Sequence, residues 1–459
     1  MSKSNQQEKF LQLRKQFPFF AFEKQDYSLS EAGLNIQYTF SLAGIYQFYP
    51  KLFFPRKTFF LPDEEFAEKL DHIVFNIGLI ELISYWKAAC PPTLIIRPFS
   101  LSPAQVHWWK NLYFHGLGEF FYLNSIAVSR NDFIDIEVSS QPPLALQGYA
   151  LQDALIIPVG GGKDSAVTMQ LLGSLPGSIP FLMNPGTAGL QTIQAMGFGE
   201  SDMIEVRRTI DPELLRLNDL GFLNGHTPFS ALLAFITILA AILSGRRHIA
   251  LSNESSANEP TIEGSSINHQ YSKSFAFESG FREYINTWVS KDFNYFSFLR
   301  PLNELQIARL FALYPQYHPI FRSCNAGSKT GSWCGKCAKC LFTYIILSPF
   351  LLKDELSLIF GSDLLDDHSL IPVLNQLCGL ADEKPFDCVG TIDEVNLALC
   401  ETIRRRNLKD LPALLRYYQG SSNFISYYQR DLSQFLQFSN PDHHLLNVYK
   451  SILNTALDA

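Results

Sequence analysis

Short apolar runs alternate with longer helical patterns through the middle of this 459-residue chain. The runs at residues 155–159, 179–183, 203–206 and 248–251 have the length of strands. Continuous apolar runs are typical of parallel strands that are buried on both faces, and helices between them favour βαβ units. The pattern therefore predicts an α/β protein with a mostly parallel, doubly wound sheet over about residues 150–345.

Both flanks of this region have patterns of their own. Residues 34–40 alternate apolar and polar positions as a half-buried strand does, residues 72–90 look helical, and residues 93–97 resemble a strand. We expect an aromatic-rich α+β N-terminal domain, and a helical C-terminal tail in which Thr391 and Glu394 form a capping box. The expected division of the chain is 1–146, 147–345 and 346–459.

The most apolar segment, residues 229–244, favours a buried helix over a membrane span. Its 16 residues fall short of the about 20 that cross a bilayer. The first residues show no apolar core of a signal peptide, and the net charge of −7 argues against a protein that coats nucleic acid. We therefore expect a cytoplasmic protein that has no membrane span and binds no nucleic acid.

Three glycines follow the first of the central strands and lead into a helix. The turn reads GGGKDS and consists of Gly160, Gly161, Gly162, Lys163, Asp164 and Ser165. Glycine lets backbone N–H groups approach a phosphate, and the first helical turn adds N–H donors and the positive end of the helix dipole. The spacing fits neither a Walker loop nor the dinucleotide fingerprint. We expect the turn to bind nucleotide phosphates, the alternative being a plain strand-to-helix turn.

The GGGKDS turn resembles the pyrophosphate loop (PP-loop) of the ATP pyrophosphatases, with Gly160 in place of the usual first serine. The resemblance implies a PP-loop fold and cleavage of ATP between its α- and β-phosphates. It also implies that the glycines cradle the phosphates and that Lys163, Asp164 and Ser165 form the catalytic group. The alternative for Lys163 is a surface residue outside the site.

Residues after the other strands are expected to meet this loop, because ligands bind beyond the carboxyl ends of parallel strands in open α/β sheets. The candidate nucleotide ligands outside the loop are Asn184, Gly186, Asn253, Glu254 and Lys329. Magnesium prefers hard oxygen ligands. The candidate magnesium ligands are therefore Asp164, Glu254 and Glu259.

Four cysteines in a C-x9-C-x2-C-x2-C pattern form the second motif. They are Cys324, Cys334, Cys337 and Cys340, out of eight cysteines in the chain. Three thiolates on a tight turn and a fourth nearby suit a closed, tetrahedral zinc site. We expect a structural zinc ion, with an iron–sulfur cluster and unliganded thiols as the alternatives.

The order of several segments carries a closer resemblance. GLIELISYWKAAC at residues 78–90, WWKNLYFHGLGEFFYLN at residues 108–124 and SNESSANE at residues 252–259 accompany GGGKDS and CGKCAKC. Together they resemble the bacterial UDP-N-acetylmuramoyl-L-alanyl-L-glutamate epimerase family (MurL family). The resemblance implies that ATP activates the terminal L-glutamate of this nucleotide-sugar dipeptide as an acyl-adenylate. Inversion to D-glutamate then releases AMP and pyrophosphate, with magnesium as cofactor, in peptidoglycan precursor synthesis.

The acid–base groups of such a reaction stay unassigned at this point. The candidates, each with a structural alternative, are His226, His269, Lys273 and Glu278. Arginine suits the phosphates and carboxylates of the substrate. The candidates are Arg207, Arg208, Arg246, Arg247, Arg282, Arg300 and Arg322. Three other classes remain open: a PP-loop ligase similar to 7-cyano-7-deazaguanine synthase, a tRNA-modifying enzyme, and a nucleotide-binding scaffold without catalysis. The oligomeric state is also open.

Overall fold

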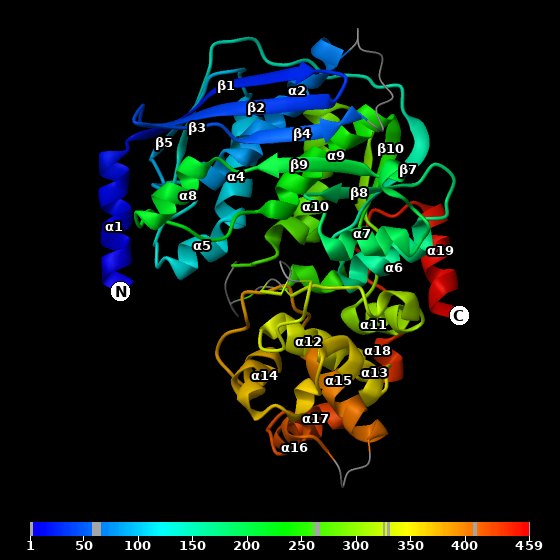
Figure 1. Cartoon of the computed structure of the whole chain (residues 1–459). Coiled ribbons are helices and arrows are strands. Elements are labelled where there is room, and N and C mark those ends of the chain that lie inside the picture. The colour runs from blue at the N-terminus through cyan, green and yellow to red at the C-terminus, as the bar shows by residue number, and fades with distance from the viewer. Residues whose placement is uncertain are drawn as a thin grey trace.

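One mixed sheet of 11 strands organises the N-terminal two thirds of the protein (Figure 1). The computed structural model describes residues 3–56, 66–259, 261, 267–324, 326–327, 331–406 and 411–458. The strands in spatial order are β11 (Asn294–Ser297), β10 (Arg246–Leu251), β7 (Gln152–Pro158), β8 (Ile179–Met183), β9 (Ile204–Thr209), β4 (Lys51–Pro55), β2 (Gly33–Leu42), β1 (Phe19–Leu29), β5 (Thr93–Ile96) and β6 (Asp135–Val138). A short strand, β3 (Tyr46–Phe48), pairs with β2.

The central strands are parallel and lie on both sides of β7. Strands β8 and β9 continue the sheet on one side, and β10 and β11 continue it on the other. All four central strands expected from the apolar runs are confirmed, whereas β11 was not expected because its four residues, NYFS, are short and half polar. The chain reverses its direction across the sheet between β7 and β10, which makes a switch point at their carboxyl ends.

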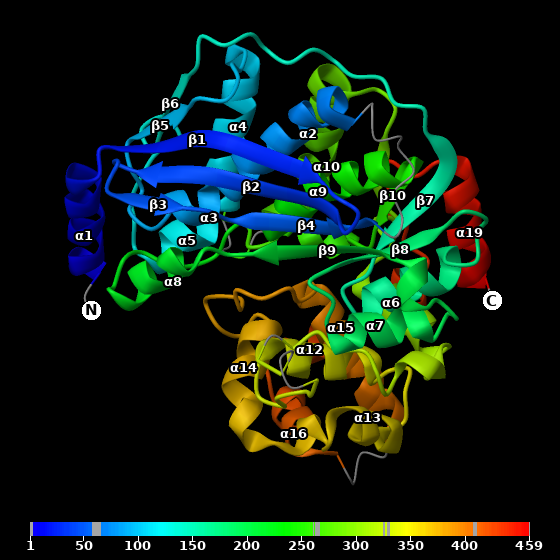
Figure 2. The ribbon, with the colours of Figure 1, turned by 45° about the horizontal axis from the view of Figure 1, so that its top comes forward.

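The N-terminal strands extend this same sheet. Strand β4 pairs antiparallel with β9 (Figure 2), with Lys51 opposite Thr209. Strand β2 is antiparallel to both of its neighbours, β4 and β1, whereas β1, β5 and β6 are parallel. The α/β class is therefore confirmed in the form of a mixed sheet. The expected strands at residues 34–40 and 93–97 are β2 and β5.

Helices cover both faces of the sheet, and the sheet separates two hydrophobic cores. On one face lie α2 (Phe66–Glu81), α4 (Pro103–Gly116), α9 (Phe229–Ser244) and α10 (Phe275–Tyr284). On the other lie α6 (Lys163–Leu172), α7 (Thr187–Gln194) and α11 (Glu304–Ala312). Within β7, Ile156 packs toward the first face, and Leu155 and Ile157 toward the second. Two buried faces explain why the strand is apolar at every position from Ala154 to Pro158.

The expected apolar helix is α9. Its residues from Ala234 to Ser244 are all buried, because the helix packs against both the sheet and α2. In the part of the chain that the structure describes, no helix is long and apolar enough to cross a membrane. The remaining helices of the N-terminal two thirds are α1 (Lys3–Gln16), α3 (Ile83–Trp86), α5 (Gly118–Leu123) and α8 (Pro212–Asp219).

The C-terminal region is helical and lies below the sheet layer in Figures 1 and 2. Its helices are α12 (Ala338–Leu347), α13 (Lys353–Phe360), α14 (Ile371–Leu377), α15 (Ile392–Arg405), α16 (Ala413–Gln419), α17 (Phe424–Tyr428), α18 (Leu432–Phe435) and α19 (Asn447–Asp458). The expected capping box of Thr391 and Glu394 begins α15. Helix α19 returns to the sheet layer and packs on α6 and α11.

Candidate active site

The glycine loop connects β7 to α6 in a conformation that requires glycine at position 161. Gly161 has φ +82°, and a Cβ there would lie 2.6 Å from the backbone nitrogen of Gly189. The N–H of Gly161 donates to Ser165 Oγ at 3.1 Å, and Ser165 Oγ donates to the carbonyl of Gly162 at 3.0 Å. Gly162 is the N-cap of α6. Ser165 therefore fastens the loop, and the first turn of α6 places its N–H groups at the loop.

A cavity of about 440 Å³ lies against this loop, at the carboxyl ends of β7, β8 and β10. This volume is within the range of small-molecule sites. Its polar wall includes Gly160, Gly162, Asp164, Ser165, Asn253 and Glu254. Its apolar wall includes Phe181, Met183, Phe229, Leu233, Leu251 and Tyr295. The sheet thus places the expected loop beside the residues that follow the fourth expected strand.

Two cations complete the polar wall. Lys273 and Arg322 both line the cavity. Burial lowers the pKa of Lys273, but the charges of Cys388, Glu254 and Asp164 hold it above its usual range. The backbone N–H of Arg322 donates to the carbonyl of Gly161 at 2.8 Å, so this segment is joined directly to the glycine loop. Cations and carboxylates therefore face the same cavity.

Glu254 is the buried acidic residue among those that line this cavity. Its side chain is buried, and its Oε1 accepts a hydrogen bond from Ser256 Oγ at 3.3 Å. Arg300 Nη1 donates to its carbonyl at 2.6 Å. The neighbouring Asn253 donates from Nδ2 to Ser297 Oγ at 3.0 Å. These contacts fix the segment after β10 in position to serve a ligand.

Lys163 lies beneath the loop, in a buried ion pair. Its side chain is 5% exposed and its Nζ contacts the carboxylates of Asp164 and Glu304. Burial lowers the pKa of Lys163, and Asp164 and Glu304 raise it above its usual range. The alternative of a surface residue is therefore wrong. The side chain connects α6 to the first residue of α11, which gives it a positioning role in this geometry.

Other expected ligands lie away from this cavity. Asn184 Nδ2 donates to the carbonyl of Arg208, and its Oδ1 accepts from the N–H of Arg208 at 2.8 Å. Asn184 lines a separate cavity of about 560 Å³. Gly186 is the N-cap of α7, and Glu259 pairs with Lys384 at a third cavity. The structure brings neither Asn184 nor Glu259 to the wall of the glycine-loop cavity. Lys329 lies outside the described residues.

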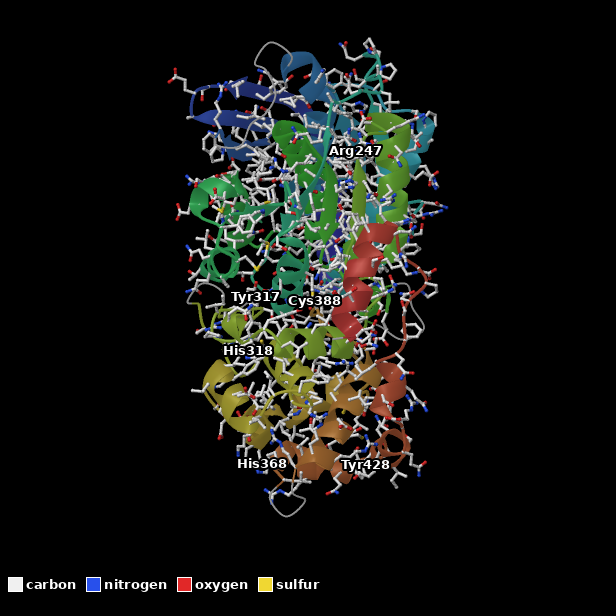
Figure 3. All side chains as sticks on the ribbon, turned by 90° about the vertical axis from the view of Figure 1, so that its right-hand side faces the viewer. Arg247, Tyr317, His318, His368, Cys388 and Tyr428 are labelled. Carbon is white, nitrogen blue, oxygen red and sulfur yellow. The ribbon has the colours of Figure 1, made fainter. Side chains whose placement is uncertain are left out.

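Most of the candidate arginines are already occupied. Arg208 pairs with the buried Glu81 at 2.8 Å, and the fully buried Arg300 pairs with Glu278 at 3.1 Å. Glu278 is thereby a structural residue in this geometry. Arg322 lines the cavity, and its guanidinium donates to the carbonyls of Gly331 at 2.9 Å and Phe321 at 2.6 Å. The arginines placed elsewhere are Arg207, which pairs with Glu205, Arg246 and Arg282, which donate to backbone carbonyls, and the exposed Arg247 (Figure 3).

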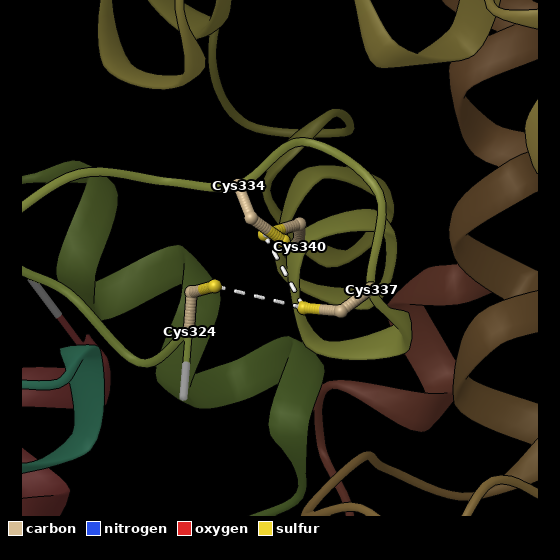
Figure 4. A group of neighbouring side chains, drawn as sticks. All are labelled: Cys324, Cys334, Cys337 and Cys340. Carbon is tan, nitrogen blue, oxygen red and sulfur yellow. Dashed lines mark hydrogen bonds between the residues drawn. The ribbon is translucent and has the colours of Figure 1, made fainter. Parts of the chain in front are cut away.

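The four motif cysteines converge on one point (Figure 4). The Sγ atoms of Cys324 and Cys337 are 3.7 Å apart, those of Cys334 and Cys340 are 3.6 Å apart, and those of Cys337 and Cys340 are 3.5 Å apart. A tetrahedral zinc ion with Zn–S bonds of about 2.3 Å requires sulfurs about 3.8 Å apart. None of the four is in a disulfide. The donor set therefore fits a tetrahedral zinc ion.

A second cluster of titratable groups lies on the other side of Lys273. Lys273 Nζ donates to Cys388 Sγ at 3.2 Å. Glu119 Oε2 contacts Nδ1 of His269 and lies 3.4 Å from Nδ1 of His226. The rings of the two histidines are 4.6 Å apart. Figure 3 shows Cys388 where the sheet layer meets the C-terminal helices.

The pKa values of this cluster diverge strongly. Burial lowers the pKa of His226 to about 4, and the nearby His269 adds to this effect. Burial also lowers the pKa of His269, but hydrogen bonds to Cys388 and Glu119 raise it to about 9. Burial raises the pKa of Cys388, but Lys273, His269 and Lys339 lower it to about 6. Groups with opposed shifts in one place are typical of acid–base sites.

Cys388 and Glu119 were not expected from the sequence. Cys388 lies in the irregular segment before α15, and Glu119 lies in α5 within an aromatic stretch. The usable signal for Cys388 is a cysteine outside the four-cysteine motif, in a loop, where functional residues concentrate. Nothing in the local sequence of Glu119 indicates a histidine partner.

Together, the sheet and its cavity define an α/β protein that presents a glycine loop at the carboxyl edge of its central strands. Residues 12–298 match the MurL N-terminal domain, and residues 320–427 match the MurL C-terminal domain. The chain therefore belongs to the MurL family, and the family expected from the sequence is confirmed.

Three relatives carry the name UDP-N-acetyl-alpha-D-muramoyl-L-alanyl-L-glutamate epimerase. The relative from Xanthomonas oryzae pv. oryzae is 35% identical over 352 residues, which cover 74% of this chain and 76% of the relative. The relatives from Salinispora tropica and Micromonospora sp. are each 34% identical and cover 77% of this chain. These matches cover 78% and 79% of the two relatives. Epimerases are isomerases, so the relatives are isomerases of a UDP-muramoyl dipeptide. No solved structure matches the chain significantly.

Proposed function

We propose that this chain inverts the terminal L-glutamate of UDP-N-acetylmuramoyl-L-alanyl-L-glutamate to D-glutamate, through an acyl-adenylate formed from ATP. The observation that carries the proposal is the glycine-loop cavity, with Asp164 and Glu254 in its wall, in a chain whose relatives are named for this epimerisation. The reaction releases AMP and pyrophosphate and serves peptidoglycan precursor synthesis in the cytoplasm.

The cavity supports ATP as the activating ligand. The loop and the first turn of α6 offer N–H groups to phosphates, and Arg322 places a guanidinium charge in the same wall. Asp164 and Glu254 offer oxygens to Mg²⁺. The apolar wall, including the partly exposed ring of Phe229, suits a purine base. Parallel strands in the order β9-β8-β7-β10-β11 and the GGGKDS turn support the PP-loop type of doubly wound fold.

Activation by ATP answers a chemical difficulty of the inversion. Removing the α-proton of a glutamate places negative charge beside an ionised α-carboxylate. Adenylation neutralises that carboxylate and turns its carbonyl into an acceptor for the enolate charge. The residues of the polar wall then bind and orient the phosphates, so the catalysis of activation consists mainly of positioning and charge stabilisation.

We also propose that the cysteine site holds a structural zinc ion. The convergence of four sulfurs and their spacing support this. Cys324 follows Arg322 by two residues, and Arg322 is joined to Gly161. The ion would hold the segment that carries Arg322 against the C-terminal helix α12, whose N-cap is Cys337. Metal binding would thus support the cavity wall from outside.

The test is turnover of the purified chain with ATP, Mg²⁺ and UDP-N-acetylmuramoyl-L-alanyl-L-glutamate. Release of AMP and pyrophosphate, and the configuration of glutamate after hydrolysis, are measured together. We expect AMP and D-glutamate in the wild type. Asp164→Asn and Ser165→Ala should each abolish AMP formation, whereas Asp219→Asn, an exposed residue at the end of α8, should retain it. AMP without inversion would indicate a ligase that lacks its acceptor, and absence of ATP cleavage would refute the proposal.

A further inference from the structure

Lys273 connects the glycine-loop cavity to the second cluster. Its side chain lines the cavity, and its Nζ donates to Cys388 Sγ at 3.2 Å. The backbone carbonyl of Lys273 accepts a hydrogen bond from the guanidinium of Arg300, which is fully buried and also bound to the carbonyl of Glu254. One buried arginine therefore fixes both Lys273 and a carboxylate segment of the cavity. A ligand activated in the cavity would lie next to the ammonium group that holds the Cys388 thiol.

Cys388 has a setting that differs from the chain's other cysteines outside the four-cysteine motif. Its side chain is partly exposed, whereas Cys90, Cys378 and Cys400 are buried. His269 hydrogen bonds to Cys388, and Nδ1 of the same imidazole contacts Glu119. The thiol, the imidazole and the carboxylate are thus joined one to the next in space. In such an arrangement the first group is activated by the second, and the third orients the second.

We propose that Cys388 is the base that removes the α-proton of the activated glutamyl residue. Lys273 would stabilise the negative charge, and His269 and Glu119 would be positioning residues for the thiolate. This inference rests on the proposed function, because it requires an acyl-adenylate whose glutamyl end reaches Lys273.

The step is balanced without a further co-reactant. The Sγ–H bond forms as the Cα–H bond breaks, and the electron pair moves into the adjacent carbonyl as an enolate. An acid on the opposite face of the α-carbon gives it a proton, which completes the D-isomer, and the acid is then reprotonated from solvent. Water then cleaves the acyl-phosphate bond and releases AMP, and Cys388 returns its proton to solvent.

The charges around Cys388 support this role. Burial raises the pKa of the thiol, and Lys273, His269 and Lys339 together lower it to about 6. The carboxylate of Glu119 faces His269 rather than the thiol. The cations around Cys388 therefore favour its thiolate, which is the form that accepts a proton.

The first experiment compares activation with inversion in Cys388→Ala and Cys388→Ser. We expect AMP release with the dipeptide substrate to continue within about threefold, and D-glutamate formed per AMP to fall at least about 100-fold. Cys378→Ala, a buried cysteine of the C-terminal region, is the matched control and should keep the wild-type ratio. An unchanged ratio in Cys388→Ala would overturn the inference. Absence of AMP release in the wild type would instead refute the proposed function, so the two failures are distinguishable.

A second measurement keeps the inference testable if the Cys388 variants fold poorly. Iodoacetamide modification of wild-type Cys388, followed by peptide mass spectrometry, should show a pH midpoint near the pKa of about 6. Lys273→Met should raise that midpoint by about one pH unit or more. A midpoint above pH 8 in the wild type would overturn the inference. A thioester on Cys388 in acid-quenched turnovers would also overturn it, because the thiol would then be a nucleophile. A second bound metal ion that is lost in His226→Ala would overturn it as well, because the cluster would then be a metal site.

Discussion

Replacing Lys163 by methionine removes the cation that balances a buried group of carboxylates. The side chains of Lys163 and Glu304 are 5% and 6% exposed and in contact. Burial raises the pKa of Glu304 well above its usual range; Lys163 lowers it, and Asp164 and Glu254 raise it further. Without Lys163, Glu304 must either remain ionised in an acidic, water-poor setting or take up a proton. We therefore expect Lys163→Met to destabilise the fold in a pH-dependent way.

The magnitude follows from the burial of the pair. Removing one partner of a buried ion pair costs about 3–5 kcal/mol in the free energy of unfolding. Because the pKa of Glu304 is raised in the folded state, folding binds its proton more tightly than the unfolded chain does. The contribution of Glu304 to stability is then full below its ordinary pKa of about 4.3 and decreases as pH rises. Lys163 lowers the pKa of Glu304, so its removal raises that pKa further in the folded state. The loss in Lys163→Met should therefore be larger at pH 8 than at pH 5, by up to about 1.4 kcal/mol per pH unit between the folded-state pKa values of the wild type and the variant.

The assay is urea unfolding at pH 5, 6.5 and 8, for the wild type, Lys163→Met, Glu304→Gln and the double variant. Removing both charges leaves neither one unpaired, so the double variant should lose less stability than the two single losses combined, and its pH dependence should be weaker. Lys450→Met, at an exposed position of α19, is the control and should change stability by less than about 0.5 kcal/mol. Equal losses at all three pH values, or full additivity, would refute this reasoning.

Two further predictions concern the loop and the cysteine site. Gly161→Ala should lower the free energy of unfolding by about 1–2 kcal/mol through its left-handed φ alone, and further through the contact with α7. Gly160→Ala, whose Cβ meets nothing within 4 Å, should unfold in urea as the wild type does; equal behaviour of the two variants would contradict the loop geometry. Chelation of the proposed zinc ion, or Cys337→Ser, should lower the Tm and weaken the proposed binding of ATP, because Cys324 lies in the segment that carries Arg322. Calorimetry of unfolding and of ATP titration measures both effects, and unchanged ATP affinity after metal removal would disprove the connection.

Features that depend on neighbouring residues were accessible from the sequence. The four central strands follow from continuous apolar runs, and α9 follows from an apolar segment too short for a bilayer. The glycine turn and the capping box at Thr391 were likewise readable, because spacing alone specifies them. The convergence of the four cysteines could also be predicted, because three of them are at most six positions apart in the chain.

Only the tertiary structure decided which distant residues meet. The N-terminal strands join the central sheet because β4 pairs with β9, and no local pattern records that pairing. Lys163 is buried because Glu304, 141 positions away, comes to lie against it. Lys273 and Cys388, 115 positions apart, meet in the same way, as do His269 and Glu119. Local hydrophobic and glycine patterns specify elements and turns, whereas such contacts arise only when packing of those elements brings their ends together.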